Sequence, residues 1–239
     1  QKKWNVDLDW QSEILSCIGS KEGFSHICLA MLGPGDTAIV PDPAFPIHNY
    51  GVALAGGNVI SVRLGNDEAF LNRIADVCEH LFPKPKLLIL NYPHNPTTMT
   101  VEPAFFETIV ELAKRFGITV IHDFAYGETS FDGYHPPSFL SVKGAKDVGV
   151  EFITMSKPYN MAGFRIGFAA GNREMLDHLA TIKGYYDYGI FQALQIAAII
   201  ALRHCDEDVK AQNERYRLRR DVVREGLEMI GWDVKPSKA

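Results

Sequence analysis

The sequence contains few cysteines, and no spacing joins them into a recognisable site. Its 239 residues include four, Cys17, Cys28, Cys78 and Cys205, with no C-x-x-C pair among them. Disulfide frameworks and structural zinc sites both need several cysteines at short, regular spacings. We therefore expect reduced, mostly buried thiols, as in a cytoplasmic protein, and we predict no metal site.

An excess of positive charge is also missing. Lysine and arginine number 24 against 29 acidic residues, which gives a net charge of -5. Proteins that bind nucleic acid neutralise phosphates with a basic patch or stripe. Nucleic acid is therefore not an expected partner.

No apolar run is long enough to cross a membrane. The most apolar stretch, residues 189–202, is short and is interrupted by Gln192 and Gln195. A membrane-spanning helix needs about 20 consecutive apolar residues, and the first residues show no signal-peptide pattern. Membrane spanning and export are both disfavoured.

Short aliphatic runs alternate with longer amphipathic segments. Such alternation is typical of strand–helix–strand units, and runs that are apolar on both faces, such as 87–90 and 118–121, suit a parallel sheet covered on both sides. We predict an α/β fold, a three-layer sandwich with a mostly parallel sheet. The predicted strands are 37–40, 58–62, 86–90, 118–121 and 151–154, and the main predicted helices are 102–116, 173–183, 191–204 and 206–230.

The last of these helices carries five arginines, which lie at positions 215, 217, 219, 220 and 224. A basic run on a helix is more often a solvated face than a ligand site. We favour the solvated face.

Two glycine- or proline-containing motifs could bind a small ligand. Gly19 to Gly23 precedes an amphipathic segment, so a helix starting there would direct free N–H groups and the Ser20 hydroxyl at an anion. The alternative is that Ser20 only caps the helix. Asn91 to Thr98 follows an apolar strand, and its two X-Pro pairs make a rigid loop that could fix the Asn95 amide; it could equally be a plain turn.

A carboxylate stands at the carboxyl end of the predicted strand 118–121. Asp123, followed by Tyr126, lies beside apolar residues, where an unpaired charge is costly. A protonated pyridine nitrogen would be a suitable cationic partner. The alternative is that Asp123 caps the following turn. Its neighbour His122 is interpreted as a packed, hydrogen-bonded histidine, because no other ligand lies at metal-binding spacing.

The most specific motif runs from Thr154 to Gly167. It places Lys157 directly after a buried strand, where we expect its amine to be desolvated and therefore nucleophilic toward an aldehyde. Thr154, Ser156 and Arg165 add two hydroxyls and a guanidinium, which are suitable groups for a phosphate.

Taken in this order, the four motifs resemble fold-type I aminotransferases of class I/II, over essentially the whole chain. The motifs 19–23, 41–48, 156–165 and 187–191 most resemble the branch of bacterial alanine (glutamate–pyruvate) aminotransferases, with LL-diaminopimelate aminotransferases nearby. The resemblance implies that residues 1–204 form a large domain that binds pyridoxal 5′-phosphate. It also implies that 205–239 form a long helix leading towards a small C-terminal domain, largely absent from these residues.

Roles for individual side chains follow from the same resemblance. Lys157 is expected to form the Schiff base and then to move the substrate proton. Asp123 would pair with the pyridine nitrogen, and Tyr126 and Asn95 would hydrogen-bond the ring oxygen. Phe45 would stack on the ring, where the family usually has tyrosine or tryptophan. The phosphate-binding residues would be Ser20, Lys21, Thr154, Ser156 and Arg165.

The implied function is transamination between an amino acid and a 2-oxo acid, with alanine and glutamate as the expected pair and a homodimer as the expected assembly. In the family, an N-terminal arm and a later arginine for the substrate carboxylate complete the site; both are expected to lie outside these residues. Two alternatives stay open. One is a lyase, such as a C–S lyase, or a racemase on the same scaffold, and the other is a non-catalytic ligand-binding or dimerisation module.

Overall fold

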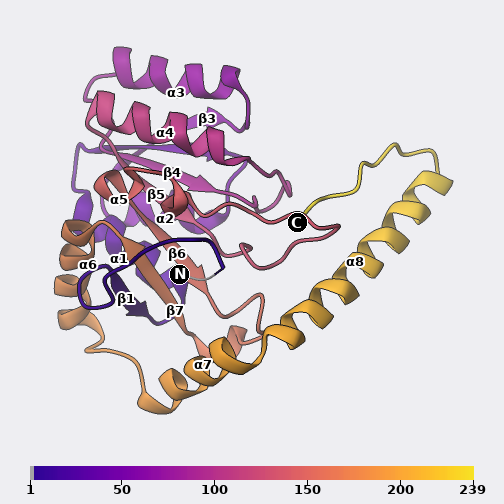
Figure 1. Ribbon diagram of the computed structural model, residues 1–239. Helices are drawn as coiled ribbons and strands as arrows, with labels where there is room; N and C mark the ends of the chain where they lie inside the picture. Colours follow the sequence, from indigo (N-terminus) through magenta and orange to yellow (C-terminus); the bar gives the residue numbers. More distant parts are fainter. Residues whose placement is uncertain (1–2) are drawn as a thin grey trace.

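The computed structural model describes residues 3–239, which form one seven-stranded sheet with helices on both faces (Figure 1). The strand order is β1-β7-β6-β5-β4-β2-β3. The five strands β2 to β6 pair in parallel, whereas β1 and β7 are antiparallel to their neighbours. The strands are β1 (Ile14–Cys17), β2 (Thr37–Asp42), β3 (Asn58–Arg63), β4 (Leu87–Asn91), β5 (Thr119–Asp123), β6 (Gly149–Thr154) and β7 (Gly167–Gly171).

Helices connect most of these strands, and the last helices follow the sheet in sequence. Four of the α-helices have ends that their sequence favours: Pro46 and Pro103 lie in first turns, Asp67 and Asn172 cap helices, and Gly117 ends one. The helices are α1 (Ser20–Met31), α2 (Pro46–Leu54), α3 (Glu68–His80), α4 (Pro103–Phe116), α5 (Ala145–Val148), α6 (Arg173–Tyr186), α7 (Gln192–His204) and α8 (Asp206–Met229), with 3₁₀ turns η1 (Phe139–Ser141) and η2 (Ala162–Phe164).

The central strands bury both of their faces. In β4, Leu88 and Leu90 pack with α3 and α4, whereas Leu87 and Ile89 pack with α1, α2 and α6. Because neighbouring side chains of a strand point to opposite faces, a continuous apolar run is what two helical layers require. The predicted three-layer α/β sandwich is confirmed.

The carboxyl ends of the central parallel strands meet at one edge of the sheet. Asn91 is the register partner of Asp123, and Asp123 is the partner of Phe152. Residues that follow β4, β5 and β6 therefore share this edge, which is where open α/β sheets bind their ligands.

All five predicted strands are present, within three residues at each end. The sequence analysis missed β1 and β7, the antiparallel pair at one side of the sheet. The sequence of β7 is Gly-Phe-Ala-Ala-Gly, and glycine and alanine are depleted in strands. The pairing with β6 and β1, which local sequence does not report, makes this segment a strand.

Helix α8 extends away from the sheet and ends far from the body of the molecule (Figure 1). Three of its arginines form ion pairs with Glu214 and Asp221, with Asp132, and with Glu228. The run is thus largely charge-balanced, although three of its arginines also line a wide cavity considered below. Within residues 3–239, no helix combines the length and the apolar character needed to cross a bilayer.

Replacing two glycines, one at the end of a helix and one inside a helix, should change the stability of the protein in opposite directions. Gly117 ends α4 in the left-handed conformation, with φ 65° and ψ 33°, so Gly117→Ala should lower the free energy of unfolding by about 1–2 kcal/mol. Gly226 lies inside the exposed helix α8 with open space around it, so Gly226→Ala should raise it by up to about 1 kcal/mol. Urea unfolding measures both, and equal effects of the two changes would contradict this account.

Candidate active site

A cavity of about 170 Å³ lies at the carboxyl ends of β4, β5 and β6. It brings together side chains that are more than a hundred residues apart in the sequence. Every residue that the sequence analysis assigned to a cofactor site lines it: Ser20, Lys21, Phe45, Asn95, Asp123, Tyr126, Thr154, Ser156, Lys157 and Arg165. Their proximity is a property of the structure, while the role of each remains a prediction.

One end of this cavity is suited to a phosphate. Ser20 is the first residue of α1, and the preceding Gly19 has φ 76° and provides no side-chain cap. The N-cap alternative for Ser20 is therefore wrong, and its hydroxyl is left for the cavity. A side chain at Gly19 would collide with the Arg165 guanidinium, so glycine lets the cation approach the free N–H groups at the start of the helix. Nearby, the Thr154 hydroxyl donates to Ser156 Oγ at 3.0 Å.

The other end holds a buried carboxylate. Asp123 is 7% exposed; its Oδ1 accepts a hydrogen bond from the Ala125 amide at 3.1 Å, and its Oδ2 lies 3.0 Å from His48 Nε2. The capping interpretation of Asp123 is thus correct for one oxygen only. Among residues 3–239, no lysine or arginine forms an ion pair with Asp123, so the cavity can supply its cation from a ligand.

Three further side chains surround the space between the two ends. Burial, and then the charge of Asp123, raise the pKa of the Tyr126 phenol, while a hydrogen bond with the Asn95 side chain opposes the rise. Tyr126 therefore stays a neutral phenol at physiological pH and can donate its proton. Phe45 precedes α2, and its ring lies edge-on to that of His48, 5.8 Å between centroids.

Lys157 differs from the sequence-based expectation. It is exposed, whereas we expected a desolvated amine. The reason is that β6 ends at Thr154, so Lys157 lies in the turn that follows the strand. Its Nζ lies 5.8 Å from the centroid of the Tyr126 ring, and within the described chain no carboxylate pairs with it. Its amine is therefore free to reach a ligand in the cavity.

His122 lies outside the group of residues that line the cavity. His122, in β5, is fully buried against Phe106, and its Nδ1 lies 2.9 Å from the Glu151 carboxylate. Its interpretation as a packed, hydrogen-bonded histidine is therefore confirmed.

A wider space of about 860 Å³ adjoins the site through Asn95, Tyr126, Ser156 and Lys157, and arginines of α8 also line it.

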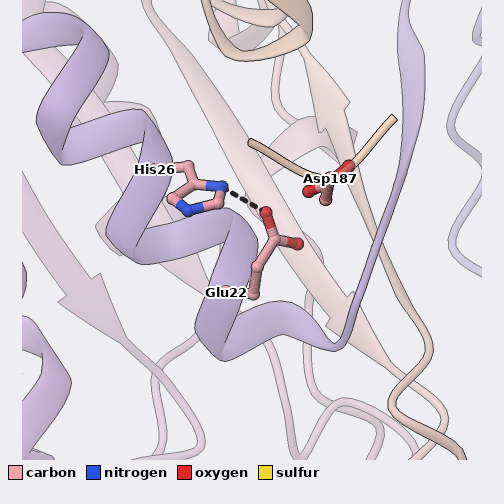
Figure 2. A group of neighbouring side chains, drawn as sticks. All are labelled: Glu22, His26 and Asp187. Carbon is pink, nitrogen blue, oxygen red and sulfur yellow. Dashed lines mark ion pairs between the residues drawn. The ribbon is translucent and has the colours of Figure 1, made fainter. Parts of the chain in front are cut away.

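One group of side chains within residues 3–239 has the donors for a metal ion. Figure 2 shows Glu22 and His26 on α1 facing Asp187. However, the Lys183 ammonium lies 3.1 Å from both Glu22 oxygens and 2.8 Å from Asp187. The chain thus supplies the positive charge itself, and the cluster ties α1 to the end of α6.

The sequence also matches a family model for aminotransferases of class I and II, over residues 2–239. The chain belongs to this family. Pyridoxal 5′-phosphate is the cofactor of these enzymes.

Similar proteins are longer than this chain. Glutamate-pyruvate aminotransferase AlaC of Escherichia coli (strain K12) is 48% identical over 239 residues, which cover the whole chain and 58% of that protein. LL-diaminopimelate aminotransferase of Halothermothrix orenii is 42% identical, covering the whole chain and 61% of the enzyme. The structure of a probable N-succinyldiaminopimelate aminotransferase from Thermus thermophilus matches with a TM-score of 0.91 and 32% identity, covering the whole chain and 64% of the other.

The residues of the cavity fit pyridoxal 5′-phosphate at both ends. The start of α1, three hydroxyls and a guanidinium suit a phosphate dianion. At the opposite end, the Asp123 carboxylate is held by one amide and one imidazole, and a protonated ring nitrogen would add the missing cationic donor. The donor set therefore matches a ligand that carries both an anionic and a cationic group.

The sequence analysis did not single out His48, which hydrogen-bonds Asp123, or Asn91, which lines the cavity. His48 follows Phe45 by three residues in the first turn of α2, and is 2% exposed. The sequence offered one signal for it, a histidine in the first turn of a helix that begins with proline. Its partner, Asp123, is 75 residues away, so only the fold reveals the contact.

A second histidine, His94, gives a pH-dependent prediction. Burial, together with nearby His48, lowers the pKa of His94 to about 4, although a hydrogen bond with the Pro43 carbonyl opposes the shift. The folded state therefore requires the neutral imidazole. Its contribution to stability is complete above the unfolded pKa of 6.5 and is lost as the pH falls towards 4, at a cost of up to about 3 kcal/mol.

Replacing His94 should make the free energy of unfolding depend less on pH. In His94→Gln, the free energy of unfolding should fall less between neutral and mildly acidic pH than in the wild type, as measured by urea titration. His135→Gln, in an exposed loop, is the matched control and should follow the wild type. A His94→Gln variant with the full wild-type pH slope would show that another group is responsible.

Proposed function

We propose that this chain is the cofactor-binding core of an enzyme that transfers an amino group between an amino acid and a 2-oxo acid. One observation carries the proposal: Lys157 and Asp123 line the same cavity as the hydroxyls and the guanidinium suited to a phosphate. Membership of the aminotransferase family and the resemblance to solved aminotransferases support it. The chain spans 58% and 61% of the two curated relatives named above, so the activity of the whole protein is part of the proposal.

Pyridoxal 5′-phosphate supplies an aldehyde carbon that takes up the amino group and a ring that accepts electrons from the substrate carbon. We infer that Asp123 holds the ring nitrogen protonated, which favours that electron flow. His48 supports this role, since it donates to the other side of the carboxylate and keeps it in one orientation. Ser20, Lys21, Thr154, Ser156 and Arg165 would hold the phosphate.

Lys157 is assigned the covalent attachment of the cofactor aldehyde and, afterwards, the movement of a proton to and from the substrate carbon. Its exposed, unpaired amine in the cavity supports both roles. Tyr126 and Asn95 would donate hydrogen bonds to the ring oxygen. Phe45 would cover one ring face; having no hydroxyl, it contributes stacking alone.

Alanine with 2-oxoglutarate is our preferred substrate pair, because the relative at 48% identity is named a glutamate-pyruvate aminotransferase. The relative at 42% identity is named an LL-diaminopimelate aminotransferase, which makes a diamino acid the second candidate. A lyase on the same scaffold would use the same cofactor residues, so the reaction products are what distinguish it from an aminotransferase.

We further propose that residues 1–204 form the cofactor-binding domain and that 205–239 lead towards a smaller domain. Helix α8 supports this division, since Val209 is its only buried residue. A cytoplasmic location stays a prediction from the reduced thiols; burial raises the pKa of both Cys17 and Cys28 to about 12, which makes them poor nucleophiles.

Covalent trapping tests the assignment of Lys157. Borohydride reduction of the cofactor-loaded protein should fix the cofactor on the peptide containing Lys157, as read by mass spectrometry. Lys157→Arg should abolish the adduct and lower the transamination rate by about 10²–10⁴-fold, since it removes the proton-transferring group. Lys143→Arg, at an exposed position, is the control and should behave as the wild type.

The reaction products then show which reaction the protein catalyses. With L-alanine and 2-oxoglutarate, the protein at its full natural length should form pyruvate and glutamate in equal amounts. A trapped adduct on a residue other than Lys157 would refute the site. Adduct formation without pyruvate or glutamate would instead refute the substrate pair.

Exposed apolar side chains around the α6–α7 connection support the expected homodimer. Tyr186 is 66% exposed, Phe191 73% and Ile200 53%. Apolar patches of this kind mark protein interfaces in otherwise well-packed proteins. We propose that a second copy of the chain covers these exposed apolar side chains.

Light scattering tests the dimer. The 239-residue chain should give twice its 26.7 kDa mass at micromolar concentration, and Ile200→Asp should shift it towards monomer, because a charge would be buried without a partner. Met229→Asp, at the exposed end of α8, should leave the mass unchanged. A wild-type monomer would contradict the assembly.

A further inference from the structure

Asn91 occupies a junction that the roles assigned above leave unexplained. It is the last residue of β4 and the register partner of Asp123 at the end of β5. Its side chain is buried, with only 4% of the residue exposed, and it lines the candidate active-site cavity. A buried amide must have hydrogen-bond partners, and those partners show what it holds together.

All of its partners belong to the two segments that meet at the site. Asn91 Nδ2 donates to the Asp123 carbonyl at 2.8 Å and to the Pro93 carbonyl at 3.2 Å. Asn91 Oδ1 accepts from the Asn95 backbone amide at 2.9 Å. One side chain thus bonds to the backbone of Asp123 and, at the same time, to the loop that carries Asn95.

The orientation of the amide follows from these partners. A flipped amide would direct its oxygen at two carbonyl oxygens and its N–H groups at the Asn95 N–H, which would lose all three bonds. Aspartate, although of the same shape, has no donor for the two carbonyls. The site therefore requires the two donors and one acceptor that asparagine combines.

We propose that Asn91 is a positioning residue, whose amide sets the distance between Asp123 and Asn95 and so aligns the two side chains that receive the nitrogen and the oxygen of the cofactor ring. This inference rests on the proposed function for the identity of the ligand. The structural link itself concerns only residues of this chain. Asn91 contributes no group to the reaction and acts through its neighbours.

The first experiment uses the cofactor-free protein. Asn91→Ala removes the acceptor for the Asn95 amide, so hydrogen exchange at that amide should accelerate about five- to tenfold, the effect of losing one ordinary hydrogen bond. Asn91→Asp keeps an acceptor at this place and should change the exchange rate less. Unchanged exchange at Asn95 in Asn91→Ala would overturn the proposal.

The second experiment uses the cofactor-loaded protein and its visible absorption. A donor at the ring oxygen stabilises the deprotonated chromophore, so misplacing Asn95 in Asn91→Ala, which adds no charge to the site, should raise the pH midpoint of the visible band by about one unit. Asn58→Ala makes the same change at the exposed start of β3 and should leave the midpoint in place. Ile74→Val, a mild core change in α3, controls for general loosening.

An unchanged midpoint in Asn91→Ala, or an equal shift in Ile74→Val, would overturn the positioning role. Should Asn91→Ala not fold, Asn91→Ser replaces it, since its hydroxyl keeps one donor and one acceptor, and a smaller upward shift is then expected. A wild-type protein that takes up no cofactor would refute the proposed function instead. The exchange measurement would still decide whether Asn91 holds Asn95.

Discussion

The site depends on a carboxylate that the fold buries and leaves open to one more cationic partner. Burying Asp123 would be costly without compensation, and the chain supplies two hydrogen bonds, from the Ala125 amide and from His48. Neither donor comes from a lysine or an arginine. The remaining stabilisation is left to a ligand. Under the proposed function, this requirement would couple cofactor binding to the protonation of the ring nitrogen. The positions of α2, the β4–α4 loop and the β6–β7 turn matter because each of them contributes residues to the cavity that Asp123 lines.

The parallel sheet makes this arrangement possible. Its central strands end at one edge, so Asn91, Asp123 and the turn after Thr154 meet without long connections. Two helical layers then cover the apolar strands and fix their register. The start of α1 reaches the same edge and offers its free N–H groups to an anion, with Arg165 packed against Gly19. Both the anion-type and the cation-type groups are thus positioned by the ends of helices and strands.

Much of this could be predicted from the sequence. Continuous apolar runs predicted the parallel strands, and four motifs at strand ends or helix starts indicated most of the cavity residues. The family resemblance alone indicated Lys21, Phe45 and Tyr126. Strands β1 and β7 were missed, since antiparallel pairing with distant residues, and not local propensity, makes the Gly-Phe-Ala-Ala-Gly segment a strand. The predicted strand ended correctly at Thr154, but the exposure of Lys157 was missed, because the course of the turn that follows a strand depends on tertiary contacts and not on local spacing. His48 and Asn91 act through contacts with partners that sequence spacing does not reveal.

The central claim is that Asp123 keeps the ring nitrogen of the cofactor protonated. Nuclear magnetic resonance of protein loaded with cofactor labelled with ¹⁵N at the ring nitrogen measures this directly. In mildly alkaline buffer, the account predicts a protonated nitrogen in the wild type and an unprotonated one in Asp123→Ala. An unprotonated ring nitrogen in the wild type would contradict it.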